Sequence, residues 1–140
     1  MKRFDAYGLF LDKSISILKN DGLFGMIIPS TILNNLTFTK LRKLILDTTT
    51  IQKIVNLGGK IFQDATNDTL ILIFKKNLTQ NFESEIYDVI KYGGGLDSIK
   101  KIKNVNFHKM SKSTPFSFEL KINKTDAQIF DKMKKNSEKY

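Results

Sequence analysis

The sequence predicts an α/β fold, and three observations carry that prediction. A segment with apolar residues at helical spacing, 5–19, is followed by the short apolar run "LFGMIIP" at 23–29. A second segment of helical period covers 37–47. Two strand-like runs then follow, "IQKIVNL" at 51–57 and "DTLILIFKK" at 68–76. Helix, strand, helix, strand, strand is the order expected for part of an α/β sheet, and 140 residues with 41% hydrophobic content suffice for one core.

The first helix and strand have clear boundaries. Asp5 stands at the N-cap position of the helix, and Gly22 follows its end. The apolar positions of this helix are Tyr7, Phe10, Leu11, Ile15 and Leu18. The run 23–29 is continuously apolar and closed by Pro29, which predicts a central parallel strand buried on both faces.

The second helix repeats the period through Leu41, Leu44 and Ile45 and is expected to end at the "TTT" of 48–50. The next two strands are separated by a loop that starts with Gly58 and Gly59 and contains Phe62.

Beyond Lys76 the pattern weakens. "EIYDVIKY" at 85–92 is strand-like, "GGG" at 93–95 indicates a loop, and the lysine-rich stretch 98–113 has no clear period. A short terminal helix is expected from Thr125 onward, capped by Asn123 or Thr125.

Charge and composition limit the functional classes. The net charge is +9 and almost all of it comes from lysine, which favours a polyanionic partner such as nucleic acid or a membrane surface, although a compositional bias of the source explains it equally well. Cysteine is absent, which excludes disulfides and thiolate metal sites and fits a reducing compartment. No apolar run has the length of a membrane span or the character of a signal peptide, so we expect a soluble, cytoplasmic protein without membrane contact.

The residues taken alone form no complete active site. His108 is the only histidine, and without cysteine there is no cluster for zinc or for a Ser-His pair, so a solvated surface histidine is expected. Asp64 and Asp68 flank the strand after the glycine loop; they are read as solvated carboxylates in preference to an acid/base or magnesium pair. The glycines at 93–95 lack the strand and helix that a phosphate loop requires.

The order of the motifs is more specific than any one of them. "FDAYGLFLDKSISILKNDGLFGMIIPSTILNN", then "LRKLIL", then "IQKIVNLGGKIFQDATNDTLILIFKK" resembles the second half of the catalytic domain in adenine-N6 DNA methyltransferases of the gamma class, as in type II and IIG restriction-modification enzymes. The resemblance is close over 4–76 and looser over 82–140. It implies that 1–80 form the C-terminal half of a doubly wound, Rossmann-like methyltransferase sheet that ends in a hairpin, and that 81–140 form an α+β connector toward a target-recognition domain. It also implies double-stranded DNA as partner and S-adenosylmethionine as methyl donor.

The resemblance gives Phe62 a function. An enzyme that methylates an adenine inside duplex DNA must extrude the base and hold it. The family places an aromatic of this loop against the flipped adenine, where stacking contributes roughly 1 to 3 kcal/mol, and Phe62 occupies the matching position. Gly58 and Gly59 would let the backbone turn tightly beside the nucleotide. The alternative is that Phe62 caps the core of the sheet.

Phe10 has two interpretations of equal weight. The resemblance places it against the adenine of S-adenosylmethionine, and its position on a helix face also fits plain core packing.

The departures from the family pattern are equally informative. The family requires a Pro-Pro motif for catalysis, and this chain cannot contain one because its only prolines are Pro29 and Pro115. In the family the glycine-rich loop and the acidic residue that bind the methyl donor lie upstream of the segment that this chain resembles. Some relatives have a basic residue shortly after the aromatic, where this chain has Gln63. We therefore expect a fragment with no catalytic residue of its own, inactive alone, with the missing N-terminal half as a possible partner and an open apolar sheet edge. The alternative function is a small basic nucleic-acid-binding or interaction module without catalysis.

Overall fold

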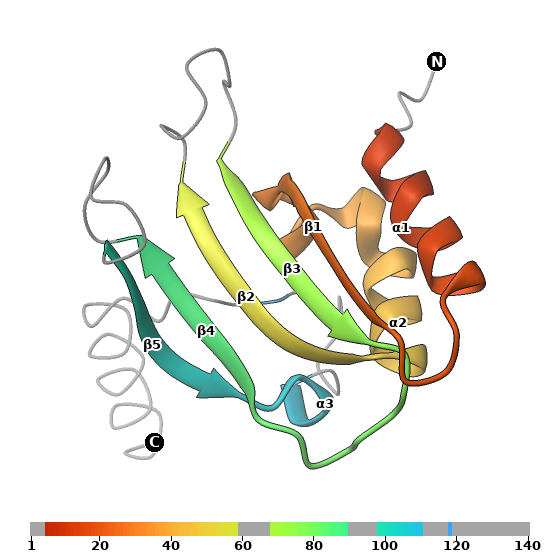
Figure 1. Cartoon of the computed structure of the whole chain (residues 1–140). Helices are drawn as coiled ribbons and strands as arrows, with labels where there is room; N and C mark the ends of the chain where they lie inside the picture. Colours follow the sequence, from red (N-terminus) through yellow and green to blue (C-terminus); the bar gives the residue numbers. More distant parts are fainter. Residues whose placement is uncertain (1–4, 59–67, 90–97, 111–117, 119–140) are drawn as a thin grey trace, which may run out of the picture.

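The structure, a computed structural model, describes residues 5–58, 68–89, 98–110 and 118 (Figure 1). Its elements, in chain order, are α1 (Ala6–Ile17), β1 (Leu23–Pro29), the 3-10 helices η1 (Ser30–Leu33) and η2 (Leu36–Phe38), α2 (Thr39–Thr48), β2 (Thr50–Gly58), β3 (Thr69–Lys75), β4 (Ser84–Val89), β5 (Ile99–Val105) and α3 (Phe107–Met110). The expected terminal helix and the glycine loop at 93–95 lie outside the described residues.

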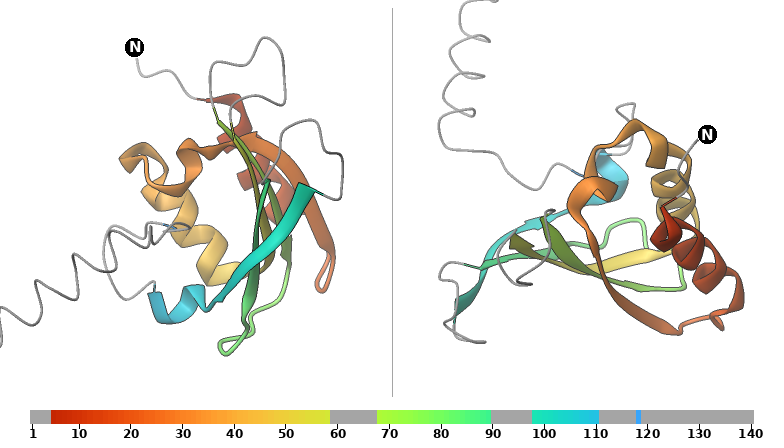
Figure 2. Two further views of the ribbon diagram at one scale, coloured as in Figure 1. Left: turned by 90° about the vertical axis from the view of Figure 1, so that its left-hand side faces the viewer. Right: turned by 90° about the horizontal axis from the view of Figure 1, so that it is seen from above.

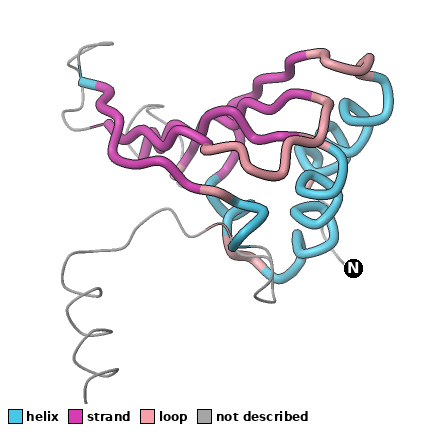
Figure 3. Tube along the Cα trace, turned by 90° about the horizontal axis from the view of Figure 1, so that it is seen from below, coloured by secondary structure: helices cyan, strands magenta, loops and turns pink. Residues whose placement is uncertain are grey.

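The strands form one five-stranded mixed sheet in the order β1-β3-β2-β4-β5. β3 pairs antiparallel with both β1 and β2, β4 pairs parallel with β2, and β5 returns antiparallel to β4. The helices α1 and α2 lie beside each other on one face of the sheet (Figures 2 and 3). The predicted α/β class is confirmed.

The prediction of a central parallel strand at 23–29 is wrong. Within the described sheet β1 is an edge strand, antiparallel to β3, with a register that runs from Leu23 opposite Lys75 to Pro29 opposite Thr69. Only one face of β1 is packed: Leu23 is 66% and Ile27 48% exposed on the other face. The continuous apolar run correctly indicated two apolar faces, but among the described residues no second layer covers one of them.

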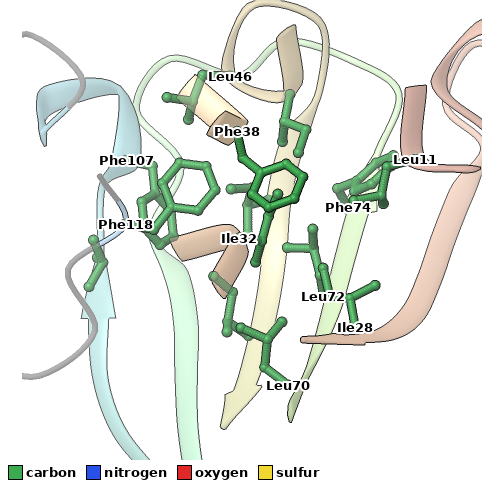
Figure 4. Close-up of a cluster of buried hydrophobic side chains, with 14 of the residues drawn as sticks. Leu11, Ile28, Ile32, Phe38, Leu46, Leu70, Leu72, Phe74, Phe107 and Phe118 are labelled. Carbon is green, nitrogen blue, oxygen red and sulfur yellow. The ribbon is translucent and has the colours of Figure 1, made fainter. Parts of the chain in front are cut away.

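The core lies between the sheet and the helices. On β3 the residues Leu70, Leu72 and Phe74 point to the same face and are fully buried, as strand alternation requires. Leu11 of α1 belongs to the same buried cluster (Figure 4). Ile15 of the same helix is also part of it. Phe74 also stacks on Phe24 of β1 with ring centroids 5.0 Å apart, so the edge strand is fixed to the core by its inner face.

Local signals explain where the helices end. α1 ends at Ile17, and the Leu18 backbone amide donates to the Ser14 carbonyl. Gly22 lies between α1 and β1, where an added Cβ would be 2.8 Å from the Lys19 carbonyl oxygen, so only glycine fits there. Thr49 ends α2: its backbone amide donates to the Ile45 carbonyl at 2.9 Å, and its hydroxyl donates to the same oxygen at 2.6 Å. Asp5 occupies the N-cap position of α1, but its side chain makes no capping hydrogen bond.

The chain beyond Lys76 continues the same sheet. β4 is joined to β2 by its ladder and by the Ser84 hydroxyl, which donates to the Ile51 carbonyl at 2.6 Å. The lysine-rich stretch that showed no period contains β5 and α3. As an edge strand with a bulge opposite Ile86 and Tyr87, β5 has no regular alternation of buried and exposed residues.

Candidate functional site at the carboxyl edge of the sheet

Three strands end at the same edge of the sheet, which lies at the top of Figure 1. β1 and β2 point the same way because both are antiparallel to β3, and β4 is parallel to β2. Open α/β sheets bind their ligands just outside the carboxyl ends of the strands. The candidate site is therefore built from Pro29, Gly58 and Val89 and the residues that follow or flank them.

Gly58 begins the loop between β2 and β3. Its φ of 70° lies in the left-handed region, which glycine adopts without steric cost. The Thr69 hydroxyl, at the start of β3, is 3.5 Å from the Gly58 carbonyl oxygen. Gly59 and Phe62 lie outside the described residues, so the base-stacking role remains a prediction.

A polar bridge supports the start of this loop from β4. The Asn56 side-chain amide donates to Asp88 Oδ1 at 3.1 Å, and the Asn56 Oδ1 atom lies 3.4 Å from the Gly58 backbone nitrogen. Asn56 and Asp88 are also direct partners in the parallel ladder. The Asn56 side chain thus links the end of β4 to Gly58 at the end of β2. Sequence spacing could not reveal this link, because β2 and β4 are far apart in the chain and meet only in the folded sheet.

The end of β1 is fixed to two other elements. The Ser30 amide donates to the Asp68 carbonyl at 2.8 Å, which ties this end to the start of β3. The Thr31 hydroxyl is 2.9 Å from the Tyr7 hydroxyl, which brings the first turn of α1 to the same edge. Burial raises the pKa of the Tyr7 phenol, so it is a neutral hydrogen-bonding group at neutral pH.

Arg42 holds the segment that follows β1. Its guanidinium is fully buried and donates through Nη1 to the carbonyls of Ile32 at 2.9 Å and Asn35 at 2.7 Å, and through Nη2 to the Thr39 hydroxyl at 3.2 Å. Burial lowers the pKa of Arg42 from its ordinary value, and arginine stays charged nevertheless. The 3-10 segment is therefore set by a side chain of α2, which the sequence analysis did not identify.

Phe10 is 62% exposed, so it does not belong to the core. It lies three residues after Tyr7 on α1, and residues at that spacing are neighbours on a helix surface. Its place near the carboxyl edge is compatible with contact to a ligand, and its role toward the methyl donor remains a prediction.

The described residues do not form a complete pocket for S-adenosylmethionine. Around the carboxyl edge they offer one exposed aromatic ring, Phe10, and no buried polar group turned toward an enclosed cavity. An apolar groove of about 270 Å³ lies between α1 and α2, but neither Phe10 nor Gly58 lines it. The residues that line the groove are Asp5, Gly8, Leu9, Asp12, Thr37, Phe38, Lys40, Leu41 and Leu44.

The other titratable candidates do not assemble a site. Asp68 is exposed, and Asp64 lies outside the described residues. His108 is half-buried on α3 and borders a hollow of about 600 Å³ at the opposite edge of the sheet, together with Asp47 and Lys109. Within 5–58, 68–89 and 98–110 no three carboxylate, histidine or cysteine groups come together as metal ligands, and no helix there is long and apolar enough to span a membrane.

Comparison with known proteins agrees with this geometry. Residues 1–62 match the Eco57I restriction-modification methylase family. The predicted resemblance to restriction-modification methyltransferases is thereby confirmed, and the match to the Eco57I family ends at Phe62, in the loop that leaves the carboxyl edge.

Two curated relatives are much longer than this chain. The type II restriction enzyme and methyltransferase RM.Eco57I of Escherichia coli is 34% identical over 93 residues, which are 65% of this chain and 9% of that protein. A putative type II restriction enzyme and methyltransferase of Methanocaldococcus jannaschii, RM.MjaORFECS2P, is 33% identical over 73 residues, 52% of this chain and 6% of that protein. The chain thus spans less than a tenth of either relative.

Solved structures show the same fold. The type IIG restriction endonuclease BpuSI superposes with a TM-score of 0.65 at 10% identity, over 84% of this chain and 16% of that one. The M protein of the type I restriction enzyme EcoKI gives a TM-score of 0.56 at 20% identity, over 67% and 22% of the two chains. The type I methyltransferase subunit from Streptococcus thermophilus gives 0.53 at 22% identity, over 80% and 24%.

Proposed function

We propose that this chain forms the C-terminal part of the catalytic domain of a site-specific DNA methyltransferase that transfers a methyl group from S-adenosylmethionine to N6 of an extruded adenine. The observation that carries the proposal is the carboxyl edge. There β2 ends at Gly58, at the same edge of the sheet as the ends of β1 and β4, and residues 1–62 match the Eco57I family. The alternative of a small basic module without catalytic ancestry is not favoured, because it does not account for that match.

In this proposal Phe62 stacks on the extruded adenine, and Gly58 with Gly59 lets the backbone approach it. Stacking worth roughly 1 to 3 kcal/mol per base offsets much of the few kcal/mol that extrusion costs. The chain supplies no Pro-Pro motif for the adenine amino group, so that motif and the main methyl-donor site come from another segment, and Phe10 adds an aromatic contact to the donor. The polypeptide alone is expected to be inactive.

The missing segment has a place to bind. Within the described sheet no further strand pairs with the outer edge of β1, and the open face carries Leu23 and Ile27 of β1 with the half-buried Ile71 and Ile73 of β3. Doubly wound sheets bury both faces, so we propose that a strand pairs with β1 and that helices of the same segment cover this face.

The test uses an enzyme reconstituted with the N-terminal methyltransferase half that the proposal requires. Phe62→Ala should weaken methylation, and Phe62→Tyr should retain much more activity because the site needs a π face. With 2-aminopurine at the target position, Phe62→Ala should leave the flipped probe brighter, because the quenching ring is gone.

Core packing of Phe62 predicts a different pattern. Phe62→Ala would then cost roughly 3 to 5 kcal/mol of stability, and Phe62→Leu would be tolerated about as well as Phe62→Tyr. Methylation rates and thermal melts of the three variants therefore separate the two roles. Activity losses that track stability losses across all three would falsify the stacking role, and methylation by residues 1–140 unaided would show that the catalytic groups are not missing.

A further inference from the structure

We propose that Lys100 and Lys103 on β5 bind the phosphates of the DNA strand beside the extruded base. The inference rests on the proposed function and extends it to a part of the chain that the Eco57I family match does not reach. It assigns a DNA-backbone contact to the β4-β5 hairpin, at the edge of the sheet farthest from β1.

The ion pairs of the described residues separate the lysines into two groups. Glu85 neutralises two lysines of the open face, with its oxygens 3.0 Å from Lys53 Nζ and 2.7 Å from Lys101 Nζ. By contrast, Lys100 and Lys103 have no ion pair with a carboxylate in the described part of the chain. Their charge is therefore available to an external anion.

The register places these two lysines on one face. Lys100 lies opposite Asp88 and Lys103 opposite Ile86, two residues apart on β4, because the bulge in the hairpin adds one residue to β5. Side chains two residues apart along a strand point to the same face, about 7 Å from each other. Two successive steps along one DNA strand span about the same axial distance.

The same register places the pair near Gly58, the last described residue before the proposed base-binding loop. Lys100 is opposite Asp88, Asp88 is bonded to Asn56, and Asn56 lies two residues before Gly58. Two strand spacings separate β5 from β2, a distance of about 10 Å. Phosphates flanking a base held at the loop after Gly58 would therefore pass close to Lys100.

The local charge favours DNA binding at the β4-β5 hairpin over binding at α1. Residues 84–89 and 98–110 contain two carboxylates against four lysines. Residues 5–22, which hold α1, contain three carboxylates against two lysines, Lys13 and Lys19. A polyanion is attracted to the hairpin and not to α1.

The competing explanation is that lysines on an edge strand only prevent strand addition. A salt titration distinguishes the two. Residues 1–140 are titrated into a fluorescein-labelled duplex of about 25 base pairs, with fluorescence anisotropy recorded between about 50 and 200 mM NaCl. The wild type is compared with the double variant Lys100→Gln/Lys103→Gln and with the matched control Lys13→Gln/Lys19→Gln, which removes two exposed lysines from the α1 side.

The logarithm of the association constant decreases with the logarithm of the salt concentration, so the slope is negative. Each lysine that contacts a phosphate should reduce the magnitude of this slope by about 1 when it is replaced. We expect a drop of about 2 for the β5 pair and no change for the α1 pair. If the wild type binds DNA and the Lys100/Lys103 variant has the same slope as the wild type, this inference is overturned. The same holds if both double variants lose an equal amount of slope. In either case the proposed methyltransferase function still stands. Absence of DNA binding by the wild type at low salt overturns the inference and removes the DNA surface from the proposed function as well.

Discussion

Asn56 of β2 and Asp88 of β4 are joined by a 3.1 Å hydrogen bond across the one parallel strand pair in the described sheet. The bond connects the strand that carries the glycine turn to the hairpin that carries Lys100 and Lys103.

Asp88→Ala removes the acceptor of this bond. The half-buried Asn56 amide then lacks a partner, so we expect a loss of about 1 kcal/mol in unfolding free energy and faster amide hydrogen exchange at Gly58. Asp88→Asn, which has nearly the same shape and keeps one acceptor oxygen, should retain most of the stability and of the protection at Gly58. Equal exchange at Gly58 in wild type and Asp88→Ala would show that the bridge does not support the turn.

Arg42 is the second target. Arg42→Met should lower the unfolding free energy by roughly 2 to 4 kcal/mol, because the carbonyls of Ile32 and Asn35 lose charge-assisted hydrogen bonds inside the protein. Urea denaturation measures the change. Lys43→Met on the exposed side of the same helix is the control and should cost less than about 1 kcal/mol, as is usual for a surface ion pair. Comparable losses in the two variants would contradict the role given to Arg42.

The open edge of β1 predicts self-association of the isolated chain. Among the described strands none pairs with the outer edge of β1, and its backbone groups, next to the exposed Leu23 and Ile27, form a template for strand addition. Ile27→Lys places a charge on this face and should shift the protein toward monomer in sedimentation velocity runs. Ile102→Lys, at an exposed position of the other edge strand, is the matched control and should leave the distribution unchanged. A wild-type chain that stays monomeric at high concentration would argue for a closed fold.

Glu85 makes stability depend on acid pH. Hydrogen bonds from Lys101 first, then Lys53 and Tyr87, lower the pKa of this carboxyl to about 2 from an ordinary value of 4.5. A depressed pKa means that the contribution is complete above pH 4.5 and is lost as the pH falls toward 2. Melting temperatures of wild type and Glu85→Gln should therefore differ at pH 6 and converge near pH 2. A constant difference across this range would exclude the ion pairs as its cause.

The sequence was informative wherever one local signal decided the structure. Helical spacing located α1 and α2, and the apolar runs located β1, β2 and β3 to within a few residues. The neighbours of β1 were mispredicted because a continuous apolar run reports on the character of both faces and carries no information on what pairs with it. β5 was missed because an edge strand rich in lysine has no alternation to detect.

In the candidate site, too, features set by a single residue differ from features set by contacts between distant segments. Gly58 adopts a left-handed φ, a conformation that favours glycine, while the roles given to Gly59 and Phe62 stay predictions. The bridge from Asn56 to Asp88 and the buried Arg42 depend on contacts between segments distant in sequence, and no spacing rule reveals these.

The parallel pairing of β2 with β4 also matters for the design of chimeric proteins that contain this chain. A junction between residues 76 and 83 looks convenient on the sequence, yet it would separate two strands of one sheet and leave β2 with an unpaired side. A chimera joined after Val105, the last residue of β5, would leave the sheet uncut but would remove the buried Phe107 and Phe118 from the core. The practical boundary for protein engineering therefore lies beyond Phe118, well after the change in sequence pattern at Lys76.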